Sequence, residues 1–159
     1  MQGRMKKHQL NSTEIKQLLW TEKVGRLATL NSDGFPYVVP VHFAFYNDKI
    51  YIHGLPKGQK VENLKSNPHV CFEVDHMSGL IMHEDPCHVN TAYQSVVIMG
   101  LAKLIEEEKE IILNQIVNKY TPTLSGKKLP AKMINVTSVI EIKIKECTGK
   151  YYEKTGAVS

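Results

Sequence analysis

The sequence predicts a single domain over residues 1–159 that is mainly β, a mostly antiparallel barrel with peripheral helices. Short runs of alternating apolar and polar residues recur along the chain, and turn signals such as Asn31-Ser32-Asp33-Gly34 separate the early ones. Three amphipathic stretches interrupt these runs, without the regular strand–helix alternation of parallel βαβ units. A chain of 159 residues suffices for one core, and no linker divides it.

The N-terminal part predicts one helix followed by a short strand. Residues 11–23 carry apolar side chains at helical spacing, with Ser12 or Thr13 placed as the N-cap. Gly25 ends the helix, and residues 25–30 form the first predicted strand. The apolar face of the predicted helix comprises Ile15, Leu18, Leu19 and Trp20.

Residues 35–53 contain two further predicted strands, joined at Asn47-Asp48. Pro36 and Pro40 lack a backbone N–H, so we expect this part of the chain at a sheet edge or a bulge. The aromatic residues alternate as core or interface side chains do, and no basic cluster interleaves with them as a nucleic-acid platform requires. We therefore expect a core role and no nucleic-acid partner for Phe35, Tyr37, Phe43, Phe45 and Tyr46.

The segment over residues 49–68 predicts an anion site. It opens as a strand that reaches His53, breaks at a Gly-rich turn, and restarts as a helix over residues 59–66. Backbone N–H groups and the helix dipole favour an anion at the start of such a helix, where Lys57 and Lys60 add mobile cations. Exposed lysines on a turn are usually only solvated, so the residues alone leave both readings open.

The second half of the sequence continues the same pattern to a total of about six strands and three helices. The predicted order is a strand over 69–75, a long loop over 76–92, a strand over 95–105 with a bulge at Gly100, a helix over 106–120, a loop over 121–133 and a last strand over 136–147.

Composition narrows the class of protein. The chain is 42% hydrophobic and 23% charged with a formal net charge of +4, values typical of a soluble globular protein with a mild preference for anions. No apolar run approaches the ~20 residues of a membrane span, and no apolar segment follows the basic N-terminus as in a secretory signal. Three cysteines without a CxxC pair favour a reducing compartment, so we expect a cytoplasmic protein with no membrane partner.

Isolated polar residues suggest further candidates. Arg26 lies in an otherwise apolar strand, where a guanidinium is costly unless an anion pairs with it. Arg and Lys on neighbouring elements can share one phosphate, so Arg26 joins Lys60 as a candidate. His53 either bonds a backbone carbonyl or faces a ligand, where it could donate a proton. We expect His42 and His69 to be structural.

A metal site is not predicted. The cluster of His83, Glu84, Asp85, Cys87 and His88 offers zinc-type ligands, but it lacks the paired CxxC or HExxH spacing of known sites.

Several stretches, in this order, resemble one known family. They are GRLATL (25–30), PYVVPVHF (36–43), KIYIH (49–53), GQKVENLKSNPHVCFEVD (58–75), Pro86-Cys87, YQSVVIMGLA (93–102) and Thr148-Gly149-Lys150. They resemble the flavin-binding split barrels related to pyridoxamine 5′-phosphate oxidase, and within these the nitroimidazole-resistance (Nim) group. The resemblance covers roughly residues 25–150 and implies an FMN-binding split β-barrel.

The resemblance further implies a homodimer with FMN at the subunit interface. By this resemblance Gln59 and Lys60 reach the phosphate, Ser95 lies near the isoalloxazine ring, and His53 is the candidate catalytic residue. Gln59 departs from relatives that often carry Arg or Ser at this position. The residues matched to cofactor contacts are Arg26, Leu27, Ala28, Thr29, His53, Gly54, Gln59, Lys60 and Ser95.

The function implied is an FMN-dependent oxidoreductase, with nitroaromatics such as 5-nitroimidazoles as the suggested substrates. FMN carries the redox chemistry, which explains why no catalytic triad or carboxylate pair stands out. The Arg-rich C-terminal segment of the true oxidases has no counterpart here. Three alternatives stay open: a flavin-binding sensor or store without turnover, a small nucleic-acid-binding barrel, and a split barrel that holds haem or a deazaflavin.

Overall fold

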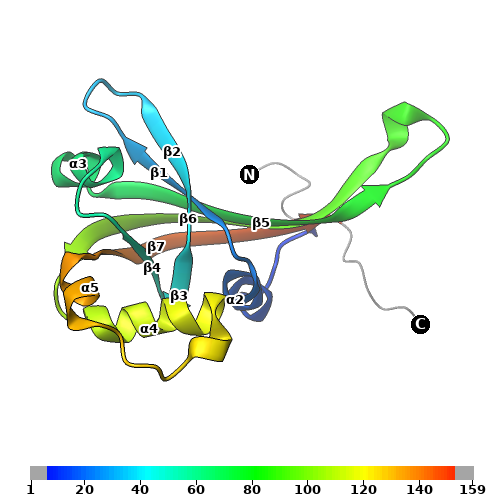
Figure 1. Ribbon diagram of the computed structural model, residues 1–159. Coiled ribbons are helices and arrows are strands. Elements are labelled where there is room, and N and C mark those ends of the chain that lie inside the picture. Colours follow the sequence, from blue (N-terminus) through cyan, green and yellow to red (C-terminus); the bar gives the residue numbers. More distant parts are fainter. Residues whose placement is uncertain (1–6, 153–159) are drawn as a thin grey trace.

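The computed structural model describes residues 7–152, which form a seven-stranded antiparallel sheet in the order β2-β1-β5-β6-β7-β4-β3 (Figure 1). Its strands are β1 (Gly25–Leu30), β2 (Pro36–Val41), β3 (Phe43–Tyr46), β4 (Lys49–Gly54), β5 (His69–Ile81), β6 (Asn90–Ile105) and β7 (Ser138–Tyr152). The helices are α2 (Ser12–Thr21), α3 (Gln59–Ser66), α4 (Lys109–Tyr120) and α5 (Ala131–Val136), with short 3₁₀ turns η1 (Pro86–His88) and η2 (Pro122–Leu124).

The sheet is curled into a split barrel. Strands β2 and β3 are its two edges, yet only His42 separates them in the sequence. Six spacings of ~4.8 Å would place the edges of a flat sheet about 29 Å apart, whereas the two residue steps from Val41 to Phe43 span at most about 7 Å. The sheet must therefore bend until its edges meet, and they do so without pairing. This confirms the predicted fold class.

The apolar core lies inside the curled sheet. Leu27, Phe43, Phe72 and Ile98 are all 0% exposed, and the two phenylalanine rings pack edge to face at 5.0 Å. Helix α2 packs against β3, β5 and β6, while α3 packs against β1 (Figure 1). A smaller apolar cluster of Tyr51, Ile112 and Val139 connects α4 to the sheet.

The first helix differs in detail from its prediction. Its N-cap is Asn11 rather than Ser12 or Thr13, because the Asn11 side chain accepts from the N–H of Glu14 while the Glu14 carboxylate accepts from the N–H of Asn11. Trp20 was predicted on the buried face but is 58% exposed. The apolar stripe through Leu18 and Leu19 is narrow, and a step of 100° per residue carries the next side chain out of it.

The prediction of two strands in residues 35–53 was wrong, since the structure has three. The chain breaks at His42, where it passes from one sheet edge to the other. The two prolines of β2 lie at an edge, as predicted, because an edge strand can lack ladder donors on one side. The expectation of a core role holds for Phe43 but is wrong for Phe35, which is 70% exposed beside the β1–β2 turn.

The predicted loop over residues 76–92 is largely a β-arm. Strand β5 continues to Ile81 and β6 begins at Asn90, with η1 at the tip, so the hairpin extends beyond the body of the molecule (green in Figure 1). Most of its side chains are exposed, so no alternating pattern marked the strands; the backbone ladder, with a register shift between Met77 and Gly79, defines them.

The C-terminal third also departs from the prediction. The expected loop over 121–133 contains η2 and the start of α5, the predicted helix begins only at Lys109, and the last strand runs over Ser138–Tyr152. The predicted bulge at Gly100 is confirmed, because the β6–β7 register shifts between Met99 and Gly100. In residues 7–152 no helix combines the length and the apolar character that crossing a membrane requires.

Candidate functional site

The turn between β4 and α3 brings a lysine against a glycine. Strand β4 ends at Gly54, and α3 begins at Gln59 after Gly58, whose φ of 126° favours glycine. No side chain caps the start of α3. A Cβ at Gly54 would lie 3.4 Å from the Lys60 Nζ, so the lysine side chain lies across the end of β4. In the described part of the chain Lys60 forms no ion pair.

His53 lies next to this turn with a buried, unpartnered ring nitrogen. Its Nδ1 finds no hydrogen-bond partner, and its ring centroid is 6.3 Å from that of His42, which stacks on Tyr120 at 4.2 Å. Burial, and then the charges of His42 and Lys60, lower the pKa of His53. The ring is therefore neutral at pH 7 and can donate or accept a hydrogen bond.

A small apolar cavity of about 170 Å³ adjoins His53. Its other walls come from α4, α5 and the residues that flank α5, namely Leu113, Ile116, Val117, Leu129, Met133, Ile134 and Thr137. The side chain of His53 thus faces the α4–α5 side of the sheet rather than the main core.

A buried asparagine fastens α3 to β1. The Asn63 amide, 3% exposed, donates to Thr29 Oγ1 and to Asn31 Oδ1, both at 2.9 Å, and its Oδ1 accepts from Gln59 Nε2 at 2.8 Å. The network places Thr29 and Gln59 on one side of α3. Sequence reasoning missed Asn63, although a polar residue between Val61 and Leu64 on the inward face of α3 is a detectable signal.

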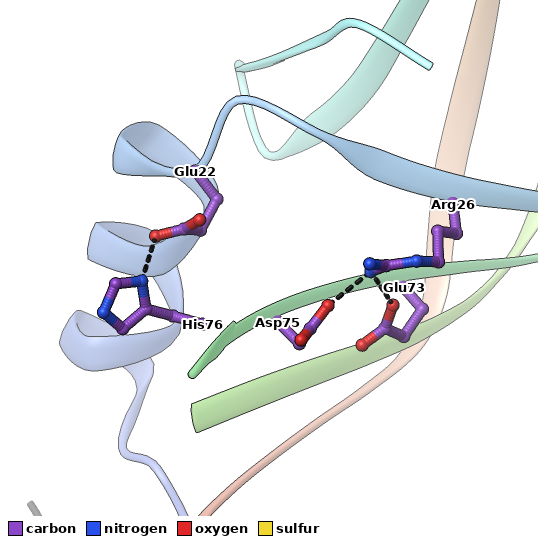
Figure 2. Close-up of polar contacts among 5 residues, drawn as sticks. All are labelled: Glu22, Arg26, Glu73, Asp75 and His76. Carbon is purple, nitrogen blue, oxygen red and sulfur yellow. Dashed lines mark hydrogen bonds and ion pairs between the residues drawn. The ribbon is translucent and has the colours of Figure 1, made fainter. Parts of the chain in front are cut away.

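Arg26 has different neighbours from Lys60. Its Nη1 binds Glu73 Oε2 at 3.0 Å and also contacts Asp75 Oδ1, both on β5 (Figure 2). These hydrogen bonds, with Asp75 first and Glu73 second, raise the pKa of Arg26, whereas burial raises the pKa of Glu73 against the effect of the guanidinium. The two acids stand at alternate positions of β5, a pattern in the sequence that indicates a common face and a cationic partner.

The remaining predicted residues lie on β1 and β6, the two strands that pair with β5. Ser95 is opposite Asp75 in the β5–β6 ladder and is buried. Leu27 is in the core, and Ala28 is half-buried opposite Cys71. The structure therefore brings His53, Gly54 and Lys60 together at one place. Arg26 lies at another place, where it contacts Asp75, the residue opposite Ser95 in the β5–β6 ladder.

The histidines of the arm tip hold the turn. His88 Nδ1 lies 2.9 Å from Asp85 Oδ2, and His83 Nδ1 accepts from the N–H of Asp85 at 3.0 Å. Within residues 7–152, no group of three or more His, Cys, Asp or Glu side chains has a geometry that could hold a metal ion.

Comparison with known proteins finds one family. The profile described as pyridoxamine 5′-phosphate oxidase matches residues 11–151. A curated, uncharacterised protein from Rhizobium meliloti is 30% identical over 91 residues, which are 57% of this chain and 52% of that protein. The chain thus spans about half the length of this relative.

Two solved structures show the same fold. A protein described as a 5-nitroimidazole antibiotic resistance protein from Bacteroides thetaiotaomicron is 24% identical with a TM-score of 0.75, and covers 90% of this chain and 86% of its own. The FAD and heme binding protein from Mycobacterium smegmatis is 19% identical with a TM-score of 0.84, and the match covers 96% of this chain and 77% of that protein. At such identity these likenesses establish the fold alone.

Proposed function

The chain belongs to the pyridoxamine 5′-phosphate oxidase family, and we propose that it is an FMN-dependent oxidoreductase. The observation that carries the proposal is the ammonium of Lys60, held without an ion-pair partner among the described residues beside the uncapped start of α3. A free cation and free backbone N–H groups at one place suit a phosphate.

The residues near Lys60 fit the phosphate of FMN. Glu62, the acidic residue in the first turn of α3, is paired with Lys65 at 2.9 Å and leaves Lys60 to an external anion. Gly54 fits as well, because any side chain there would contact the lysine. Gln59 uses its amide within α3, so we expect its contribution to come from the backbone N–H.

FMN, when bound, supplies two-electron redox chemistry. His53 is the residue that we assign to the reacting end of the site, as a hydrogen-bond donor to the flavin or the substrate. Its lowered pKa keeps the ring neutral at pH 7. Proton donation from a cationic His53 would therefore contribute only at lower pH.

Arg26 is expected to contribute less to phosphate binding than Lys60. To reach the phosphate it would have to leave both Glu73 and Asp75. From the family resemblance we propose that β1, with Leu27 and Thr29, lies beside the flavin, and that Ser95 does so too.

We assign nitroaromatics, such as 5-nitroimidazoles, as the substrate class, since a protein of this fold is described as a 5-nitroimidazole resistance protein. The proposal includes a homodimer with FMN at the interface. Sedimentation of the FMN-loaded protein at micromolar concentration tests the dimer, and a monomeric mass with FMN bound would contradict the shared site.

The cofactor assignment is tested by the visible spectrum of the purified protein and by titration with FMN and FAD. We expect Lys60→Ala to weaken FMN binding at least about tenfold, since a hydrogen bond to a charged group contributes about 1.5–3 kcal/mol. Lys145→Ala removes an exposed lysine of β7 that forms no ion pair within residues 7–152, and it should leave the affinity within about twofold. Equal affinities for the two variants would refute the phosphate site.

Turnover separates an enzyme from a flavin store. The FMN-loaded protein is reduced chemically under anaerobic conditions and mixed with a 5-nitroimidazole, and flavin reoxidation is followed by absorbance. Reoxidation faster than with free reduced FMN supports the oxidoreductase. Bound flavin that reoxidises no faster than free FMN would favour the sensor or storage protein.

A further inference from the structure

A second pocket lies between α2 and α4 and contains none of the residues assigned to FMN. This α2–α4 pocket has a volume of about 420 Å³, within the range of about 300–1,000 Å³ typical of small-molecule sites. No carboxylate is among its lining residues, which are Trp20, Lys23, Ala44, Phe45, Tyr46, Gln115, Asn118 and Lys119.

One side of the α2–α4 pocket is aromatic. The rings of Trp20 and Phe45 are tilted against each other with centroids 6.1 Å apart, and Tyr46 is half-buried next to them on β3. Trp20 leaves more than half of its surface uncovered. A flat apolar ligand would cover these faces and gain both burial and ring contacts.

The other side of the pocket carries two lysines. Lys119 Nζ donates to the carbonyl oxygen of Leu19 at 2.8 Å and lies 3.4 Å from the ring centroid of Phe43. Lys23 Nζ donates to the carbonyl oxygen of Lys119. These contacts link the C-terminal ends of α2 and α4. Because an ammonium has three donors, each lysine keeps donors for a ligand. Neither lysine forms an ion pair with any residue in the range 7–152.

The protonation of Lys119 responds to its surroundings near neutral pH. Burial lowers its pKa to about 7, with the charge of Lys23 acting in the same direction and Glu22, at the end of α2, opposing them. Tyr120 lies beside the ammonium, and burial raises the pKa of that phenol, so it stays neutral. The remaining titratable group in the lining is Tyr46. An anion in the pocket would favour the charged form of Lys119.

We propose that the α2–α4 pocket binds a small aromatic carboxylate, with its ring against Trp20 and Phe45 and its carboxylate at Lys23 and Lys119. The ring faces and the two cations are complementary to these two parts of such a ligand. Gln115 and Asn118 add neutral amide donors in the same lining. This site is independent of the proposed flavin chemistry.

The probe is 3-phenylpropanoate, compared with its neutral analogue 3-phenylpropanamide. Trp20 is the only tryptophan of the chain, so fluorescence excited at 295 nm reports on the pocket directly. At pH 6 we expect the carboxylate to bind at least about tenfold more tightly than the amide, a ratio that corresponds to about 1.4 kcal/mol. Between pH 6 and pH 8 the affinity for the carboxylate should fall about tenfold as Lys119 loses its proton, while that for the amide stays constant.

Variants assign the effect to the lysines. Lys119→Met should abolish the pH dependence and reduce the preference for the carboxylate, and Lys23→Met should also reduce the preference. Lys65→Met, which removes the same charge from α3, should change neither. If Lys119→Met does not fold, the acid–amide comparison on the unmodified chain and Lys23→Met still decide.

Several results would overturn the proposal. Equal binding of acid and amide, or binding of the acid without pH dependence, would show that the lysines do not recognise the ligand. An unchanged Trp20 signal with millimolar probe would show that the pocket does not bind it. Binding of inorganic phosphate as tight as binding of the carboxylate would show a site for anions in general, without a role for the rings.

Discussion

Substitution of Asn63 by alanine tests whether one buried amide fixes α3 to the sheet. The change removes the hydrogen bonds to Thr29 and Asn31 and the one from Gln59. Gln59 is exposed and Asn31 is half-buried, so water can replace part of what they lose. Thr29 Oγ1 is buried, and its contact with the Tyr37 carbonyl oxygen, at 3.5 Å, is too long to compensate.

The expected loss in free energy of unfolding is about 2–3 kcal/mol. Each neutral hydrogen bond contributes about 0.5–1.5 kcal/mol, and a buried group left unpaired costs about 1–3 kcal/mol. Urea denaturation followed by circular dichroism measures the loss as a lower midpoint at unchanged slope. Glu62→Ala, an exposed change on the same helix, should cost less than about 1 kcal/mol.

A double-mutant cycle separates the hydrogen bond from the lost volume. Thr29→Val removes the partner hydroxyl, so the Asn63–Thr29 pair should show a coupling of about 1 kcal/mol. A loss below about 0.5 kcal/mol for Asn63→Ala, or a coupling near zero, would refute the argument that this network positions α3 and hence Lys60.

Three further outcomes follow from the geometry. Gly100→Ala would place a Cβ 2.6 Å from Ile142 Cγ2 and 2.9 Å from the carbonyl oxygen of Lys143, both closer than van der Waals contact allows. We therefore expect a loss of about 2 kcal/mol or more in urea denaturation, and a neutral result would contradict the tight bulge. Glu141→Gln should lower the free energy of unfolding by about 1 kcal/mol at pH 7 and by less at pH 3. Burial raises the pKa of Glu141, but Lys49 and its other partners outweigh burial and keep the pKa in the folded protein low. The stability that the Glu141 carboxylate contributes is therefore present above its unfolded pKa and disappears as pH falls through its folded pKa. An equal cost at both pH values would exclude the ion pair as its source. NMR titration of His53 should give a midpoint below 6.5, and a midpoint at or above that value would contradict its burial as a neutral ring.

The strand β4, the turn after it and helix α3 could be predicted closely from the sequence. Alternation up to His53 and the glycines at 54 and 58 are local signals, and α3 spans Gln59–Ser66 as expected. Local backbone preferences and turn residues suffice to define such a segment. The proximity of Lys60 and Gly54 follows from that local geometry.

The arm and the break between the two edge strands could not be predicted in the same way. Strands β5 and β6 extend into solvent because they pair with each other, and their exposed side chains carry no alternating pattern. The break at His42 has no local signal either, because it reflects the meeting of two sheet edges that are distant along the ladder.

By itself the sequence determined the fold class, the family and the residues of the β4–α3 turn, because these depend on local pattern and on motifs in a fixed order. Only the tertiary structure decided the partners of the charges. The sequence made Arg26 a phosphate candidate, but only the structure shows Glu73 and Asp75 of β5 beside it. The sequence likewise marks Lys119 as an ordinary helix residue, and only the structure shows it enclosed by α2 and Phe43. The charge of a side chain is written in the sequence, but its neighbours, its solvation and hence its pKa arise from segments that meet only when the sheet curls.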